Sequence, residues 1–421
     1  MDATEPEGTK ARLARRHTRL GKLPWLVAGL GTLVVRSAKA QSYVDSRLLF
    51  YKESGDRTQV IDPVFLLHQD FGETGGQLDL ILGYDSISGA SPTGAYPTLD
   101  ATTSASGQTS ASGQVPLASY KDHREALTAS YGRRFGSHMP TIDLSFSKEN
   151  DYTARSAGIS DAWTMLEGRG TLHFGLAVSS DIVAPTTNDL KLPKRSEGYS
   201  LGWTWILGEK DLFDVSASLM RLSGYLDDPY KVVPIGSPES QTNMPEHRPN
   251  SRARYALVGR YGHHTSGDSA IKATYRFYTD DWGIRAHTLE LEYEMRLGSG
   301  WIVSPQARLY VQSAASFYGS LFVEPQQFMS ADYRLSPFSS LLGGLKVSHE
   351  IFPGLDAYVA VTLQTQTGRD RVSLPGVSSG DEEGRRSVSA ADLSEEGLSR
   401  QSVSAADMKV TTVTFGFRRR F

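Results

Sequence analysis

The amino-acid sequence predicts an all-β fold, a transmembrane antiparallel β-barrel of about 16 strands, with 14 to 18 as the range. Three observations predict it. Apolar and polar residues alternate along most of the chain, the connections fall into a long and a short set, and the chain ends on an aromatic residue. Long extracellular loops and short periplasmic turns are typical of outer-membrane barrels, so we expect the two sets on opposite sides.

The composition excludes several classes of protein. The chain has 421 residues, 44 Lys and Arg against 47 Asp and Glu, and no cysteine. Without cysteine there are no disulfide scaffolds, thiolate zinc sites or cysteine nucleophiles. The balanced charge provides no basic footprint, so we expect no nucleic-acid partner. Aromatic residues make up 10% of the chain, which argues against disorder.

The first forty residues have the form of an export signal. Basic residues precede an apolar stretch from Leu23 to Val35, which at about 13 residues is too short to span a bilayer. Ala38 to Ala40 then provide an A-x-A cleavage site. We therefore expect 1–40 to be a cleaved signal peptide and 41–421 to be a single barrel domain in the bacterial outer membrane. The alternative is a short N-terminal membrane anchor.

The strands are predicted from a period of two residues. Leu289, Leu291 and Tyr293, for example, alternate with Glu290 and Glu292. Successive side chains of a strand point to opposite faces, so one set would face lipid and the other the lumen. The segments with this pattern are 45–53, 58–71, 76–85, 123–133, 140–149, 151–158, 170–179, 197–207, 211–222, 250–261, 268–279, 284–296, 300–313, 340–350, 355–366 and 407–421.

The connections between these segments sort by length. With both mature termini in the periplasm, the periplasmic connections are nearly all short and glycine-bearing: 72–75, 134–139, 159–168, 208–210, 262–267, 298–300 and 351–354. The long ones fall on the extracellular side: 86–122, 180–196, 223–250, 314–339 and 367–406. The first and last of these are the two that we expect to be long enough to fold in and narrow the lumen.

The C-terminus carries the most specific local pattern. Val413, Phe415 and Phe417 alternate with small or polar residues, and the chain ends at Phe421. This resembles the terminal strand that the barrel-assembly machinery reads, so that machinery and periplasmic chaperones are the implied partners, beside outer-membrane lipid and lipopolysaccharide. Arg419 departs from the pattern, although an arginine near headgroups can snorkel. The alternative is an ordinary edge strand.

A family resemblance follows from the start of the mature chain. The run RLLFYKESGDRTQVIDPVFLLHQDF, followed by LDLILGYDSISGASPTGA, resembles the opening of a bacterial envelope family, domain of unknown function 3570. The resemblance is specific over about residues 45–95 and implies an outer-membrane β-barrel, with no catalytic or binding residue carried over. Asp and Ser bond to nearby backbone, so we read the motif as a structural turn rather than a ligand site. The motif residues are Tyr84, Asp85, Ser86, Gly89, Ala90, Ser91 and Pro92.

Charged residues in the predicted lumen are the candidate functional residues. Basic ladders on three strands flank an acidic one, and a transverse field of this kind can select solutes by charge. The alternative is that these charges pair across strands and fill the barrel. The candidate pore-lining residues are Arg252, Arg254, Arg260, Lys272, Arg276, Glu290, Glu292, Glu294 and Arg308.

We expect from these observations a porin-like channel or binding barrel for small hydrophilic or ionic solutes, without a cofactor, a metal or catalytic residues. The first alternative is a scaffold or docking protein for periplasmic or extracellular partners. A second is an outer-membrane hydrolase, which would have to assemble a triad around a histidine such as His173, His287 or His349. The oligomeric state and the solute stay open.

Overall fold

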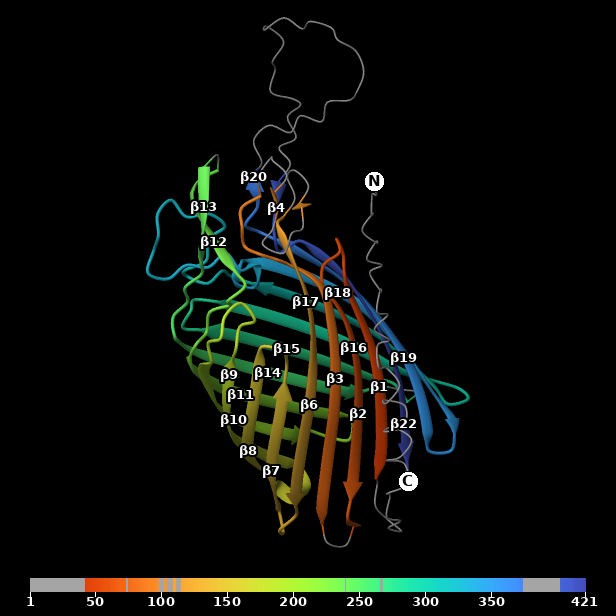
Figure 1. The fold of residues 1–421 in the computed structure, drawn as a ribbon. Helices are drawn as coiled ribbons and strands as arrows, with labels where there is room; N and C mark the ends of the chain where they lie inside the picture. The colour runs from red at the N-terminus through yellow and green to blue at the C-terminus, as the bar shows by residue number, and fades with distance from the viewer. Residues whose placement is uncertain are drawn as a thin grey trace, which may run out of the picture. The chain divides into compact units, whose positions relative to one another are not determined.

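A computed structural model of the chain confirms the all-β barrel. It describes residues 42–421 except 73–74, 98–101, 104–108, 111–114, 239, 266–267 and 374–401, so the predicted signal peptide lies outside the described residues. Sixteen antiparallel strands close into one barrel, with β1 paired to β22 (Figure 1). The strands are β1 (Tyr43–Glu53), β2 (Gln59–Asp70), β3 (Gly76–Pro92), β6 (Leu117–Arg133), β7 (His138–Lys148), β8 (Tyr152–Met165), β9 (Gly170–Val183), β10 (Leu192–Ile206), β11 (Asp211–Gly224), β14 (Ser251–His264), β15 (Ala270–Asp280), β16 (Arg285–Leu297), β17 (Trp301–Gln312), β18 (Phe338–Phe352), β19 (Leu355–Gly368) and β22 (Met408–Arg420).

The exterior of the barrel is apolar. Leu144, Leu201 and Leu363 are 57%, 57% and 61% exposed, as are many other large side chains of the same face. Such a surface is stable against hydrocarbon, and a closed barrel leaves no strand edge to satisfy there. Trp163 and Trp301 lie on this face near the end with short connections and stack on histidines, as expected at a membrane interface. The chain is therefore an outer-membrane barrel.

The two ends of the barrel differ as predicted. All the long connections lie at one end, which we call the loop end, while the other end, which we call the turn end, has only short connections and carries the C-terminus (Figure 1). The loop end also carries three two-stranded hairpins: β4 (Thr102–Thr103) with β5 (Thr109–Ser110), β12 (Val232–Ser237) with β13 (Ser240–Pro245), and β20 (Val372–Ser373) with β21 (Ser402–Val403). Among the described residues, no helix is both long and apolar enough to cross a membrane.

Several strands are longer than the sequence indicated. β8 continues to Met165 where a ten-residue turn was predicted, because Ile159 and Trp163 keep facing outward and pair with Leu176 and Leu172 of β9. The turn itself is the short 3-10 element η2 (Leu166–Gly168). β3 and β6 also pair as far as Pro92 with Leu117, so the motif at 84–92 lies in a strand and the turn interpretation was wrong.

Candidate functional site

Four neighbouring strands place a row of charged side chains on the lumen face. The register sets Arg254 of β14 opposite Asp280 and sets Arg276 of β15 opposite Val258 and Thr288, so these side chains share one face. We call the lumen face of β14–β17 the basic wall. By register, the nine candidate pore-lining residues all lie on it: Arg252, Arg254, Arg260, Lys272, Arg276, Glu290, Glu292, Glu294 and Arg308. Whether they select a solute stays a prediction.

Toward the turn end, the charges of this wall are paired. Arg260 binds Asp214 at 2.7 Å. Lys272 lies 2.9 Å from Glu292 and 3.0 Å from Glu294. Here the alternative of charges that neutralise one another across strands describes the wall well.

Toward the loop end, the pairing is incomplete. Arg252 binds Asp280 at 2.5 Å. Arg254 and Arg276, however, form no hydrogen bond or ion pair with any other described residue, and the Nε of Arg254 is buried without a partner. Arg308 donates to the amide oxygen of Gln364 at 3.1 Å rather than to a carboxylate. The charges of this wall are therefore less completely paired toward the loop end than toward the turn end, and solute selection by the unpaired ones stays a prediction.

Two long connections form a cap over the loop end. We define the cap as the described residues of 225–250, between β11 and β14, and of 313–337, between β17 and β18. Lys231 reaches the far side of the mouth, where its Nζ donates to Ser91 Oγ at 2.9 Å and to the carbonyl of Pro92. Because β3 is the third strand of the barrel and β11 the ninth, the first connection crosses the mouth.

The cap contacts every other connection at the loop end. Backbone bonds join it to 93–116, 281–284 and 369–407, through Val232 to Thr93, Ser316 to Trp282, and Arg369 to Pro337. Side-chain contacts join it to the three remaining connections, at 54–58, 149–151 and 184–191, through Arg57 over the ring of Tyr333, Tyr230 to Asp151 and Thr186 to Tyr230. The loop end is thus one interconnected structure.

Apolar packing stiffens the cap. One cluster contains Trp282, Phe317 and Leu335, which are 3%, 7% and 4% exposed. A second contains Val233 and Met329. Such clusters fix the cap in one arrangement, because buried side chains of this size interdigitate closely. The sequence indicated that 86–122 and 367–406 would narrow the lumen, but the described parts of those connections only brace the cap.

A buried ion network holds the two halves of the cap together. Asp332 accepts from Arg248 at 2.8 Å and from the Nε of its neighbour Arg334 at 2.8 Å, and it is only 1% exposed. Burial acts to raise its pKa, but Arg334, Arg248 and Lys231 outweigh this and lower the pKa of Asp332 to about 2. Asp332 is therefore ionised at any physiological pH.

Burial shifts the pKa values of two further groups of the network. Burial raises the pKa of Glu246, although Arg248 and the hydroxyl of Ser330 act against that change. Burial also lowers the pKa of Lys231, which Asp332 partly offsets. Both groups keep hydrogen-bond partners, as buried charges require.

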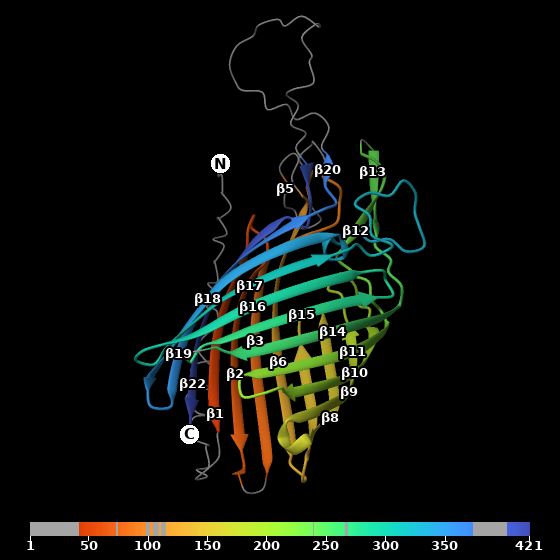
Figure 2. The ribbon, with the colours of Figure 1, turned by 180° about the vertical axis from the view of Figure 1, so that it is seen from behind.

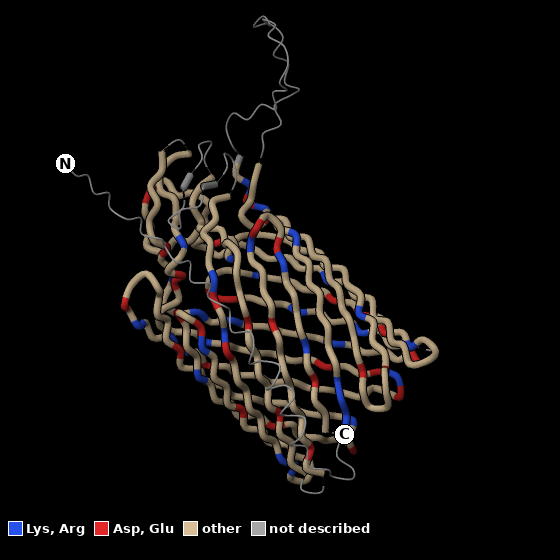
Figure 3. Tube along the Cα trace, turned by 45° about the vertical axis from the view of Figure 1, so that its right-hand side comes forward, with Lys and Arg blue, Asp and Glu red and all other residues tan. Residues whose placement is uncertain are grey.

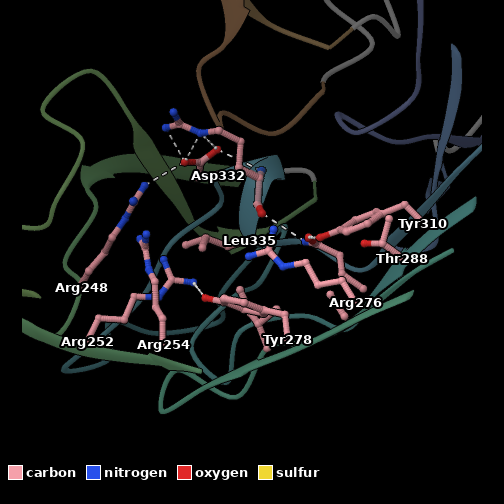
Figure 4. A pocket seen from close by; sticks show the side chains of 13 residues that line it. Arg248, Arg252, Arg254, Arg276, Tyr278, Thr288, Tyr310, Asp332 and Leu335 are labelled. Carbon is pink, nitrogen blue, oxygen red and sulfur yellow. Dashed lines mark hydrogen bonds and ion pairs between the residues drawn. The ribbon is translucent and has the colours of Figure 1, made fainter. Parts of the chain in front are cut away.

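A cavity of about 420 Å³ lies between the cap and the basic wall (Figure 4). In Figure 4 Asp332 and Leu335 lie above it, while Arg252, Arg254 and Tyr278 lie below. The complete lining is Arg248, Arg252, Arg254, Arg276, Tyr278, Ile284, Ala286, Thr288, Tyr310, Gln312, Asp332, Arg334 and Leu335. The lining thus contains five arginines and one carboxylate.

Acidic residues gather on the opposite wall. In the closed order of strands, β3 and β15 lie eight positions apart and therefore face each other across the lumen (Figures 1 and 2). Asp85 of β3 accepts from Arg124 at 2.5 Å and is hydrogen-bonded to Asp62 of β2. Charged positions recur along the strands as well as in the connections (Figure 3). We call this lumen face the acidic wall after Asp62 and Asp85, whose cationic partners are Arg47 and Arg124.

The motif at 84–92 contributes to both the acidic wall and the cap. Asp85 belongs to that wall, and Ser91 and Pro92 receive Lys231. Gly89 has φ +126° because the carbonyl of Arg57 passes so close that a Cβ would lie 2.3 Å from it. The other motif members, Tyr84, Ser86 and Ala90, are part of β3.

The C-terminal residues close the barrel. In β22, Val413, Phe415 and Phe417 pair with Phe50, Leu48 and Ser46 of β1. The backbone N–H of Phe421 donates to Ser42, and Arg419 donates to the carbonyl of Pro353 at the turn end. Recognition by the assembly machinery stays a prediction.

None of the three histidines considered for catalysis has the contacts of a triad among the described residues. His173 bonds to Thr204, but that hydroxyl donates to Asp214 and so cannot give its proton to the histidine. His287 contacts Tyr275 and His349 stacks on Trp301. A hydrolase is not favoured by this geometry.

A family model decides the relationship of the chain. The model of the family described as "Protein of unknown function (DUF3570)" matches residues 30–380. The chain belongs to this family. The match extends over β1 to β19, far beyond the segment 45–95 that indicated it in the sequence. No curated protein matches the chain.

Solved structures similar to this DUF3570 barrel include other outer-membrane proteins. A bacterial polysaccharide outer membrane secretin has a TM-score of 0.47 at 9% identity, over 90% of this chain and 98% of that one. OccD3 of Pseudomonas aeruginosa has 0.43 at 9%, over 91% and 92%. OccK2 of the same organism, in complex with glucuronate, has 0.41 at 8%, over 91% and 98%. These values are too low to carry any argument about a solute.

The sequence indicated Arg252, Arg254 and Arg276 of the cavity lining but not the other lining residues. Tyr278 and Tyr310 could have been found, because they continue the inward alternation of β15 and β17. Arg248, Asp332 and Arg334 could not, because they lie in connections where no periodicity places a side chain.

Proposed function

We propose that this barrel binds small hydrophilic solutes, preferring anions, and lets them pass through its lumen. The observation that carries the proposal is the pair of unpartnered guanidinium groups, Arg254 and Arg276, beneath the cap. Arg254 is half-buried with its Nε enclosed, and Arg276 is exposed to the lumen. An anion that enters the site is stabilised by charge-assisted hydrogen bonds to these two groups. A lumen bounded by about 16 strands is wide enough for water unless connections fill it.

The cap limits this passage at the loop end. Its contacts with every other loop-end connection support a narrow route rather than a wide one, so we expect a small conductance. Opposed acidic and basic walls also support discrimination by charge, since a transverse field orients and sorts small ions.

The test is single-channel recording of the refolded mature barrel in a planar bilayer, with reversal potentials in a salt gradient. We expect ohmic steps with anion selectivity, and a shift of the reversal potential toward cations when Arg254→Gln and Arg276→Gln are combined. The matched control is Arg195→Gln, because this arginine is paired with Glu197 and lies outside both the cavity and the basic wall.

Cation selectivity of the unmodified barrel would contradict the anion preference. Silence from a barrel whose folding is shown by heat-modifiable migration on a gel would contradict passage altogether. In that case the docking alternative gains support, because the closed cap and the three hairpins of the loop end would then be its main exposed features.

A further inference from the structure

The floor of the cavity contains a depression lined by small side chains. On β16, Ala286 and Thr288 face the lumen between larger residues of the neighbouring strands. Ala286 is flanked by Tyr278 and Gln312, and Thr288 is flanked by Arg276 and Tyr310. Small side chains between large ones create a depression, and its volume of about 420 Å³ is within the range of small-molecule sites.

The unpartnered cations lie at two separate points of this depression. Arg254 is set opposite Asp280, and Arg276 lies four residues before Asp280 on the same strand. Four residues of a β-strand extend about 13 Å, so the two side chains leave the wall well apart. Tyr278 lies between them, with its ring 5.9 Å from the guanidinium carbon of Arg276.

The other cations of the cavity are already neutralised. Arg252 binds Asp280, and Arg248 and Arg334 bind Asp332. At the edge of the same cavity, Arg248 and Arg334 bind the carboxylate of Asp332. Guanidinium groups favour such hydrogen bonds to carboxylates. Two charges on the wall are therefore left for a ligand.

We propose that the cavity is a binding site for small organic dianions whose two acidic groups are separated by a short chain or ring. One acidic group meets Arg254 and the other meets Arg276. Thr288, opposite Arg276, provides a hydroxyl group, whereas the hydroxyls of Tyr278 and Tyr310 already donate to Asp280 and Gln312. Ile284 and Leu335 provide the apolar contact for the middle of the ligand. This deepens the proposed function by naming a ligand class, but binding does not require that the lumen conducts.

The test measures binding to the full mature barrel refolded in detergent. The fluorescence of Trp282 is a suitable signal, because its ring packs 4.1 Å from the guanidinium carbon of Arg252 beside the cavity. A Trp282→Phe variant identifies the part of the signal that comes from this residue, and calorimetry provides a second readout. The probes are malonate, glutarate and pimelate, together with acetate and inorganic phosphate.

We expect the longer dicarboxylates to bind at least about tenfold more tightly than acetate, malonate or phosphate, because only they engage both arginines. Arg254→Gln and Arg276→Gln should each weaken pimelate binding by about tenfold or more and remove the preference for length. Arg260→Gln should leave binding unchanged. Thr288→Phe should abolish it by filling the depression without changing a charge.

Several outcomes would overturn the inference. Equal affinity for all five anions, with strong dependence on salt, would mean general electrostatic attraction to the wall. A preference for phosphate would mean a compact oxyanion site. Loss of binding in Arg260→Gln as great as in Arg276→Gln would place the site elsewhere. Heat-modifiable migration shows for each variant whether the barrel is folded, and Arg254→Lys retains the charge if the glutamine variant fails to fold.

The two proposals can fail separately. A barrel that binds pimelate but is silent in the bilayer contradicts passage and leaves the site intact. A conducting barrel that binds no dicarboxylate contradicts the site alone.

Discussion

At position 89 the backbone conformation requires glycine. Its φ of +126° and the approach of the Arg57 carbonyl both exclude a side chain. We expect Gly89→Ala to cost about 1–3 kcal/mol, because the substitution combines an unfavourable dihedral with a clash. The temperature at which heat-modifiable migration is lost should fall. Gly259→Ala is the control, since a Cβ there meets nothing within 4 Å, and an equal fall in both variants would contradict this reading.

Asp332 is the residue on which the cap depends most. Its depressed pKa means that its contribution to stability is complete above the unfolded value of about 4 and is lost as pH falls toward 2. We expect the Trp282 part of the fluorescence to change between about pH 4 and pH 2, in a step that Asp332→Asn does not show. Asp332→Asn should loosen the cap by about 3–5 kcal/mol even at neutral pH, seen as tryptic cleavage after Arg334. Cleavage of the wild-type barrel at the same rate would contradict the role of Asp332 in holding the cap.

At the scale of elements, all sixteen strands followed from the alternation of residues. This worked because a strand with lipid on one side and the lumen on the other has different chemistry on its two faces along its whole length. It failed at strand ends, as in β8, where Asp161 lies on the outward face between Ile159 and Trp163 and interrupts the apolar alternation. The hairpin of β12 and β13 was missed because it touches no lipid and shows no such period.

The faces of the strands can be mapped with thiols. Because the chain has no cysteine, single cysteines can be introduced one at a time without background. We expect Leu289→Cys and Leu291→Cys, on the lipid face, to resist a hydrophilic thiol reagent in membranes, while Thr288→Cys and Glu290→Cys react. Reaction rates measured by mass spectrometry check this. A reversed pattern would shift the register by one residue and place the charges in lipid.

The last strand carries the predicted assembly signal. We expect Phe421→Ala to lower the fraction of chain that reaches the folded, heat-modifiable form in cells, because the terminal aromatic would be lost for recognition. Phe352→Ala is the matched control, since Phe352 is an exposed aromatic at the turn end that does not end the chain. Equal losses in the two variants would mean that the effect is one of barrel stability and not of recognition.

At the scale of the whole molecule, the cap decides how much of the lumen is open. Replacement of residues 317–333 by a short Gly-Ser linker removes Asp332, Tyr333 and the Phe317 contact. We expect uptake of small sugars in a liposome-swelling assay to rise several-fold, because the route is no longer covered. A linker of the same kind at 184–191 is the control. An unchanged rate would mean that the lumen is closed elsewhere.

The cavity could be predicted only in part, because half of it depends on how distant parts of the molecule come together. Its wall repeats a local pattern, but its roof depends on contacts between segments far apart in the chain, such as Lys231 with Ser91 and Arg57 with Asp407. No local property of any of these residues indicates its partner.

Those distant contacts also determine the order in which parts of the structure form. The bond from Arg57 to the carbonyl of Asp407 joins residues 350 positions apart, next to the seam where β1 meets β22. Contacts of such separation form late, because the intervening chain must be ordered first. The loop end is therefore complete only when the final strand is in place, so a half-inserted barrel offers no finished mouth to the solutes around it.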